Sequence, residues 1–188
     1  MRKSFRELLE DCPVIAAVKD MEGLKKCCES ECRIVFILFG DVCSIGEIVR
    51  TVKESGRVAL VHMDLVNGLS SREISVDFIY RETKADGIIS TKQPQIRRAK
   101  ELSMYTVHRF FVIDSMAYDN VERHVKTVRP DCVELLPGVM PKVIRRMCEY
   151  VPVPVIAGGL ISDKEDIMTA LDAGAVSIST TRKELWFI

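Results

Sequence analysis

The sequence of 188 residues has no long hydrophobic run, and its longest unbroken apolar stretch extends only from Ile34 to Phe39. A helix that spans a membrane needs about 20 consecutive apolar residues, so we expect no membrane partner. The first residues, MRKSFRELLEDCPV, carry charges throughout and lack the apolar segment of a secretion signal. These absences predict a protein that works in the cytoplasm.

An excess of charge is also absent, because Lys plus Arg and Asp plus Glu both number 27. The whole chain therefore lacks the excess of basic residues that is typical of a nucleic-acid-binding domain, although a local basic patch is still possible. Seven cysteines are present, and none forms a C-x-x-C motif. Cys27, Cys28 and Cys32 cluster without a histidine nearby in the sequence, which favours reduced, buried thiols over a metal site. We expect no metal and no cofactor.

Eight short apolar segments with the character of strands recur along the chain. They begin near residues 14, 34, 58, 86, 105, 131, 153 and 175, and segments with the character of helices separate them. This alternation predicts an α/β fold with a parallel sheet, and eight units favour a compact (β/α)8 TIM barrel over residues 1–188 as a single domain. Such barrels typically have about 250 residues, so an open flavodoxin-like sheet with fewer strands is the alternative.

Capping motifs predict where several helices begin. A Ser followed three residues later by Glu is a capping box, in which both side chains bond backbone amides at a helix start. The motif occurs at Ser4, Ser44, Ser70 and Ser162. The segment from Arg57 to Gly68 is predicted to be a strand, and the tail RKELWFI is predicted to form a short helix that closes the barrel.

Two junctions between strand and turn, Val151 to Ser162 and Gly174 to Thr181, predict a phosphate site. Gly158 and Gly159 lack Cβ atoms, so a ligand could approach the backbone closely there. The helix that follows would direct amide groups and a positive dipole end at the same place. In TIM barrels the phosphate site is commonly formed by the loops after strands seven and eight.

Other polar residues are predicted at the carboxyl ends of the strands, where TIM barrels place their functional sites. They are Lys19, Asp64, Ser90, Lys92, Arg109, Glu134, Ser179 and Thr180. Several have structural alternatives: Lys19 as a solvated charge, and Arg109 with Glu134 as an ion pair that lines the barrel mouth. For His62 we favour a structural hydrogen bond to Asp64 beneath the site.

Motifs of known catalytic classes are missing, since H-E-x-x-H, G-x-S-x-G and P-loop patterns are all absent. Lys19, Lys92, Asp64 and Glu134 have the chemistry for acid–base or Schiff-base reactions on a sugar phosphate, but their spacing does not require it. The residues alone lead to a small phosphate-binding barrel. A sugar-phosphate enzyme of the aldolase, lyase or isomerase type is the alternative function.

Six runs occur in a specific order and spacing: VHMDLVNGL, DGIISTK, HRFFVIDSMA, PDCVELLPGVMPKVI, PVIAGGLI and GAVSISTTRKELW. In these runs the sequence resembles the glycerol-3-phosphate-responsive antiterminators of the glycerol uptake operon. The resemblance implies a TIM barrel that is a regulator rather than an enzyme, and that binds glycerol 3-phosphate and then acts on leader mRNA. The family often has Gln where this chain has His108.

The resemblance also implies roles for individual residues. Phosphate binding falls on Gly158, Gly159, Ser179 and Thr180, and the candidates around the glycerol moiety are Lys19, Asp64, Lys92, Arg109 and Glu134. The candidates for RNA binding are Arg97, Arg98, Lys142, Arg145 and Arg146, although ordinary solvated helix faces carry similar charges. The small surface of one monomer, which must serve both ligand and RNA, suggests a homodimer.

Overall fold

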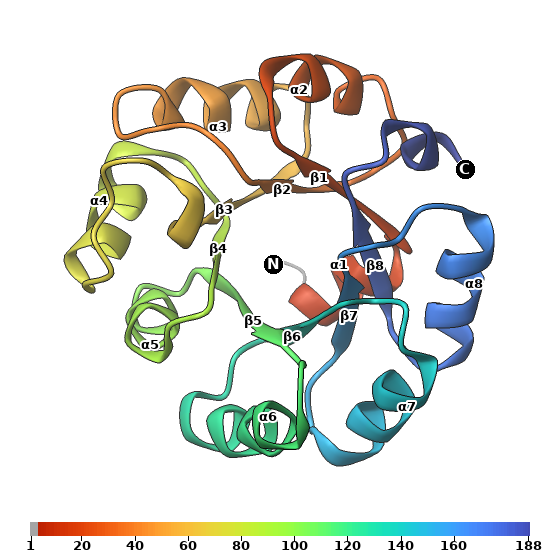
Figure 1. Cartoon of the computed structure of the whole chain (residues 1–188). Coiled ribbons are helices and arrows are strands. Elements are labelled where there is room, and N and C mark those ends of the chain that lie inside the picture. Colours follow the sequence, from red (N-terminus) through yellow and green to blue (C-terminus); the bar gives the residue numbers. More distant parts are fainter. Residues whose placement is uncertain (1–3) are drawn as a thin grey trace.

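Eight parallel strands close into a barrel in the computed structural model, which describes residues 4–188. The strands pair in chain order, and β1 pairs with β8 to complete the ring (Figure 1). The predicted (β/α)8 fold is therefore confirmed, and the open-sheet alternative is wrong. The strands are β1 Val14–Val18, β2 Ile34–Ile37, β3 Val58–His62, β4 Gly87–Ser90, β5 Tyr105–Phe111, β6 Cys132–Leu136, β7 Val155–Gly158 and β8 Ser177–Thr180.

Short helices surround the barrel and connect successive strands (Figure 1). The helices are short, since α2 has 7 residues and even α6 has only 14. Short helices explain how the fold fits into a chain below its usual size. The helices are α1 Phe5–Glu10, α2 Met21–Cys27, α3 Ile45–Glu54, α4 Ile74–Glu82, α5 Gln93–Glu101, α6 Ser115–Val128, α7 Pro141–Tyr150 and α8 Lys164–Asp172, with 3-10 helices η1 Met63–Leu65 and η2 Lys183–Phe187.

The strands are buried on both faces, as is typical of a parallel sheet that helices cover. Inside the ring, side chains such as Phe36, Leu60 and Ile156 form one hydrophobic cluster, and the outer faces of the strands pack against the helices. Toward the carboxyl ends of the strands, buried polar side chains such as Arg109 and Glu134 replace apolar ones. The candidate site therefore begins where the apolar interior ends.

The first helix, α1, closes the amino-terminal end of the barrel. Phe5 and Leu9 on α1 are buried and belong to the hydrophobic cluster inside the ring. The predicted capping box of Ser4 and Glu7 is confirmed, because each side chain bonds the backbone amide of the other residue. The predicted short helix of the tail is also confirmed as η2, where the Trp186 indole donates a hydrogen bond of 2.9 Å to the last residue of β8.

The other predicted capping boxes are wrong. The Ser44 hydroxyl bonds a loop aspartate and makes no capping bond to α3. The N-cap of α4 is Glu73 rather than Ser70, and the N-cap of α8 is Asp163 rather than Ser162. Short polar side chains bond many nearby backbone and side-chain groups, so a matching motif does not ensure a cap.

The predicted strand from Arg57 to Gly68 is shorter in the structure, because β3 ends at His62 and the chain turns into η1. Asp64 lies within η1 and so leaves the alternation of the strand. Its carboxylate accepts a hydrogen bond of 2.8 Å from the Thr91 amide, which follows β4. The turn thus directs Asp64 toward the end of the neighbouring strand.

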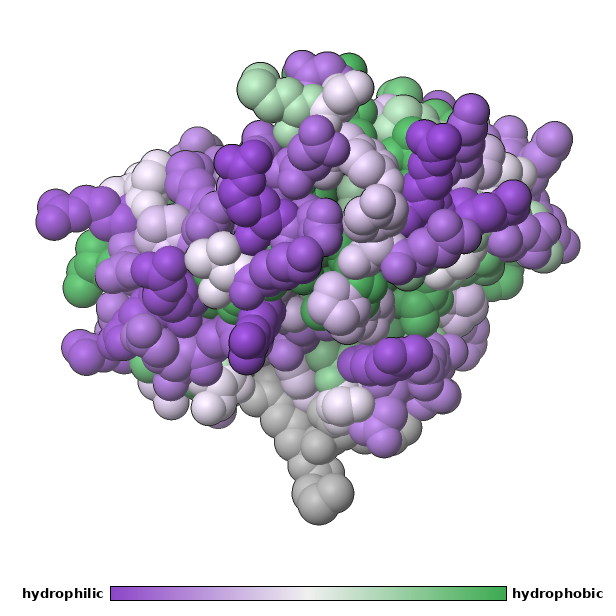
Figure 2. Space-filling model, turned by 90° about the horizontal axis from the view of Figure 1, so that it is seen from below, coloured by the Kyte–Doolittle hydropathy of each residue, from purple (hydrophilic) through white to green (hydrophobic). Residues whose placement is uncertain are grey.

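Hydrophilic residues cover most of the side of the molecule seen in Figure 2, with hydrophobic residues scattered between them. Within residues 4–188, no helix is both long enough and apolar enough to cross a membrane. All seven cysteines are free, and no group of three or more His, Cys, Asp or Glu side chains in the described range could hold a metal ion. Burial raises the pKa of Cys27 to about 12, so this thiol is protonated at neutral pH.

Candidate functional site

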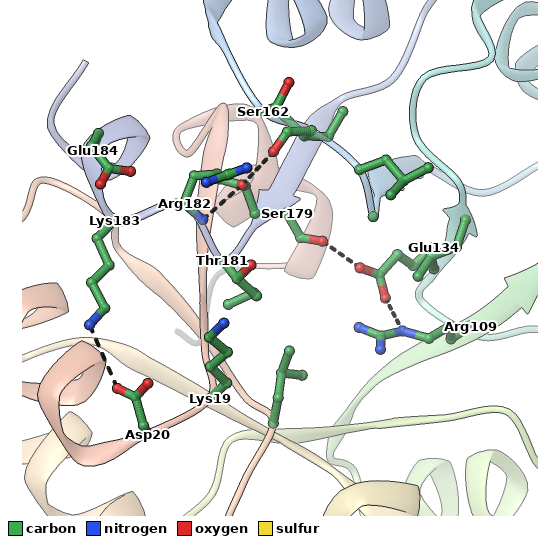
Figure 3. Close-up of a pocket in the computed structure, with 17 residues that line it drawn as sticks. Lys19, Asp20, Arg109, Glu134, Ser162, Ser179, Thr181, Arg182, Lys183 and Glu184 are labelled. Carbon is green, nitrogen blue, oxygen red and sulfur yellow. Dashed lines mark hydrogen bonds and ion pairs between the residues drawn. The ribbon is translucent and has the colours of Figure 1, made fainter.

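A cavity of about 930 Å³ lies at the carboxyl ends of the strands (Figure 3). The segments after β1, β7 and β8 form much of its wall, and side chains from β5 and β6 complete it. This is the end at which TIM barrels place their functional sites. The predicted site residues that line the cavity are Lys19, Arg109, Glu134, Gly159, Ser179 and Thr180.

A buried ion pair lies at the inner end of the cavity. Arg109 Nε is 2.6 Å from Glu134 Oε2, and the Ser179 hydroxyl donates a hydrogen bond of 2.5 Å to Glu134 Oε1 (Figure 3). Glu134 is 0% exposed and Arg109 is 7% exposed. A buried carboxylate needs such partners, because an unpaired charge is costly to remove from water. The ion pair considered from the sequence is therefore present, and it fixes both side chains at the barrel mouth.

The two glycines after β7 have different roles. A Cβ atom on Gly158 would lie 2.5 Å from Glu134 Oε1 and 2.7 Å from Ser179 Oγ, closer than contact distance allows. Gly158 therefore makes room for a buried carboxylate, whereas the sequence suggested room for a ligand. Gly159 lines the cavity and has a φ of +76°, a conformation that favours glycine.

Two basic side chains of the cavity have no carboxylate partner. Neither Lys19 nor Arg182 forms an ion pair within the described residues, whereas Lys183 Nζ lies 2.7 Å from Glu22. Figure 3 shows the Lys19 ammonium and the Arg109 guanidinium on different sides of the cavity. The cavity thus holds positive charge that internal carboxylates leave free for an anion.

Backbone amides in the last two loops are also available. Leu160 and Ile161 follow β7 and Thr181 follows β8, and none of their amides donates to an acceptor in the described part of the chain. The Thr180 hydroxyl, in contrast, is occupied, because it donates a hydrogen bond of 3.0 Å to the Ile161 carbonyl. Free amides beside unpaired cations are an arrangement that binds anions.

Asp64 and Lys92 form a separate cluster after β3 and β4, outside the cavity wall. The Lys92 ammonium donates to Asp64 Oδ1, and the Thr91 amide donates to Asp64 Oδ2. Burial by itself would raise the pKa of Asp64, but these hydrogen bonds and the Lys92 charge outweigh it, so the pKa is lowered. The charges of Asp64 and Lys92 therefore pair with each other, and neither residue lines the cavity.

The side chain of His62, the last residue of β3, is buried, with the residue 3% exposed. Its Nδ1 atom has no hydrogen-bond partner among the described residues. Asp64 Oδ2 lies 3.8 Å away, too far for a hydrogen bond, so the predicted bond is absent. Burial, followed by the Arg109 charge, lowers the pKa of His62 to about 3, so the imidazole is neutral near pH 7.

His108 and Ser90 face the helices rather than the cavity. His108 is fully buried and its ring stacks 5.8 Å from the His124 ring of α6. Burial lowers the pKa of His108 to about 4. The Ser90 hydroxyl donates a hydrogen bond of 2.7 Å to Gln95 of α5. The departure from the family at His108 therefore lies away from the cavity.

The basic residues predicted to bind RNA differ in their partners. The Arg98 guanidinium contacts Asp77 at 2.6 Å and Glu101 at 2.7 Å, so two carboxylates already neutralise it. The remaining candidates are exposed and have no ion-pair partner in the described residues; they are Arg97 on α5 and Lys142, Arg145 and Arg146 on α7.

Comparisons with known proteins identify the family. Residues 14–186 match the family described as glycerol-3-phosphate responsive antiterminator. The chain belongs to this family. It is 42% identical to the protein YgcP of Escherichia coli (strain K12), over 95% of this chain and 94% of that one.

Two solved structures agree with this assignment. The glycerol uptake operon antiterminator regulatory protein from Listeria monocytogenes has a TM-score of 0.89 at 36% identity, with 92% of this chain and 94% of that chain covered. A glycerol uptake operon antiterminator-related protein from Thermotoga maritima has a TM-score of 0.83 at 33% identity, with coverages of 93% and 98%.

Membership of the antiterminator family makes the protein a regulator rather than a sugar-phosphate enzyme. Deoxyribose phosphate aldolase from Aeropyrum pernix has a TM-score of 0.71 but only 13% identity, so that likeness is one of fold alone. Lys92, a Schiff-base candidate of the enzyme alternative, is paired with Asp64 and lies outside the cavity wall.

Sequence reasoning missed Arg182 as a cavity residue of this antiterminator. Arg182 is the second residue after β8, and Lys19 is the first residue after β1, so a search of the residues just past the strand ends could have found Arg182. The free amide of Thr181 could not be predicted, because the sequence does not show which backbone amides form hydrogen bonds between strands.

Proposed function

We propose that the protein binds glycerol 3-phosphate in the cavity and, in response, acts on leader mRNA as a transcription antiterminator. The observation that carries this proposal is the cavity itself, where unpaired Lys19 and Arg182 lie near free amides of the last two loops. A phosphate ester matches both features, because it is an anion with several acceptor oxygens. Family membership supports the same effector.

In this proposal the phosphate lies between the loops after β7 and β8. Leu160 and Thr181 contribute amides, and Lys19 contributes charge. Ser179 and Thr180 act by positioning, because their hydroxyls already bond Glu134 and the Ile161 carbonyl. The start of α8 contributes little, since the acidic N-cap Asp163 already occupies it.

The glycerol moiety then extends toward Arg109 and Glu134 at the inner end of the cavity. Arg109 uses only Nε for Glu134, so its two terminal nitrogens stay available as hydrogen-bond donors for hydroxyl groups. Asp64 and Lys92 lie outside the cavity wall and receive no direct contact in this proposal.

A thermal-shift titration tests effector binding. At about 100 times its dissociation constant, glycerol 3-phosphate should stabilise the fold by roughly 2.7 kcal/mol, whereas glycerol should have no effect. Lys19→Met should reduce the shift, because it removes an unpaired cation of the cavity. Lys25→Met is the matched control, since Lys25 is an exposed lysine of α2 outside the cavity. An unchanged shift in Lys19→Met would place the phosphate elsewhere.

For RNA we propose the exposed face of α7 as the binding surface. Lys142, Arg145 and Arg146 are free of ion pairs within the described residues, whereas Arg98 on α5 is already neutralised. Contacts with RNA phosphates depend on such uncompensated cations. The homodimer suggested by the small surface stays a prediction.

A further inference from the structure

The His62 imidazole is a buried polar group that the proposed function leaves unexplained. Buried polar atoms almost always have a hydrogen-bond partner, and each exception requires an explanation. His62 is 3% exposed, and its Nδ1 atom has no partner among the described residues. The other such atom among the described residues is His108 Nδ1, which faces α6 rather than the inside of the barrel.

The position of His62 is next to the cavity wall. Leu60 belongs to the cluster inside the ring, and side chains alternate along a strand, so His62 also faces inward. The register pairs Ile37 with Val61, which brings the following residues, Leu38 and His62, side by side. Leu38 lines the cavity, as does Arg109, whose charge is close enough to lower the pKa of His62.

The chemistry at this position suits a hydroxyl group. The imidazole is neutral, so Nδ1 is either a donor or an acceptor, depending on the tautomer. A hydroxyl can donate and accept, so it satisfies Nδ1 in both cases. Asp64 Oδ2, 3.8 Å from Nδ1, already accepts the Thr91 amide and hydroxyl, so the histidine is the group that still needs a partner.

We infer that His62 forms a hydrogen bond to a hydroxyl of the glycerol moiety and so distinguishes glycerol 3-phosphate from phosphate esters without hydroxyls. This inference rests on the proposed function, because it places the ester in the same cavity. The phosphate end is held by the β7 and β8 loops, and the hydroxyl end reaches His62 beside Arg109 and Leu38.

Isothermal titration of two esters tests the inference: glycerol 3-phosphate, and n-propyl phosphate, which has the same chain length and no hydroxyls. In His62→Leu we expect glycerol 3-phosphate to bind about tenfold more weakly, the effect of one hydrogen bond, and n-propyl phosphate to bind as before. His62→Asn has nearly the shape of His62→Leu but keeps a polar atom near the Nδ1 position, so it should retain the preference.

His108→Leu is the matched control. His108 is equally buried and its Nδ1 atom also lacks a partner, but it faces α6. This substitution should leave the ratio of the two affinities unchanged. If His62→Leu keeps the wild-type ratio, or if wild-type protein binds both esters equally, the role of His62 is refuted while the phosphate site stands. If wild-type protein binds neither ester, the proposed function itself fails.

Discussion

One missing Cβ atom determines how the buried charges of the site are arranged. Glu134 lies over Gly158 because glycine leaves that space free, and there it bonds Arg109 and Ser179. Arg109 and Glu134 are also paired in register on adjacent strands, so their proximity could be expected from the sequence. The role of Gly158 could not, because a glycine that accommodates a side chain looks the same in sequence as one that accommodates a ligand.

We expect Gly158→Ala to lower the free energy of unfolding by roughly 1 to 3 kcal/mol, the usual cost of overpacking. The added methyl group would displace the Glu134 carboxylate and weaken its contact with Arg109. Urea unfolding measures the change. Gly46→Ala in α3 is the control, because a Cβ there meets only a backbone oxygen at 3.6 Å. Equal stability of Gly158→Ala and wild type would contradict the observed packing of Glu134.

Among the helices, the start of α8 matters because it follows the loop that the proposal assigns to phosphate. The Asp163 side chain accepts a hydrogen bond of 2.9 Å from the Asp166 amide, so Asp163→Ala should cost about 1 kcal/mol. Ser162 is exposed and bonds only the Asp166 side chain, so Ser162→Ala should cost less. Thermal denaturation of both variants gives the order. A larger loss in Ser162→Ala would mean that Ser162 is the cap after all.

The existence of strands and helices could be predicted from the sequence, but several of their ends could not. Apolar runs mark the strands because both faces of each strand are buried. Ends depend on competition between local bonds: a capping box forms at Ser4, but Asp163 replaces Ser162 as the cap one residue later. The end of β3 at His62 likewise depends on the turn into η1, which no single residue of the strand signals.

Ring closure determines which of the predicted residues share a site. β1 pairs with β8, so Lys19 reaches the same cavity as Ser179 although they lie at opposite ends of the chain. β3 and β4 lie across the ring from β7 and β8 (Figure 1), so Asp64 and Lys92 form their own cluster. The sequence places a residue at the carboxyl end of its strand, whereas the shape of the cavity depends on all the loops together.

The cavity and the proposed RNA surface meet in the turn that precedes α7. The Gly138 amide donates a hydrogen bond of 2.9 Å to the carbonyl of Gly159, a residue of the cavity wall, and α7 begins at Pro141. An effector that bonds the β7 loop can therefore influence the position of α7. If glycerol 3-phosphate raises RNA affinity as proposed, thermodynamic linkage requires RNA to raise effector affinity by the same factor.

For RNA binding, we expect Arg145→Ala combined with Arg146→Ala to weaken binding of a glycerol operon leader RNA at every salt concentration. Loss of two phosphate contacts should reduce the slope of log affinity against log salt by about 1.4, since each contact to a single strand contributes about 0.7. Filter binding with and without glycerol 3-phosphate measures both the salt slope and the coupling between effector and RNA.

Arg98→Ala is the control and should leave the salt slope unchanged, because Asp77 and Glu101 already neutralise that cation. A wild-type slope in the double variant would exclude α7 as the RNA surface, because lost phosphate contacts must change the number of counterions released.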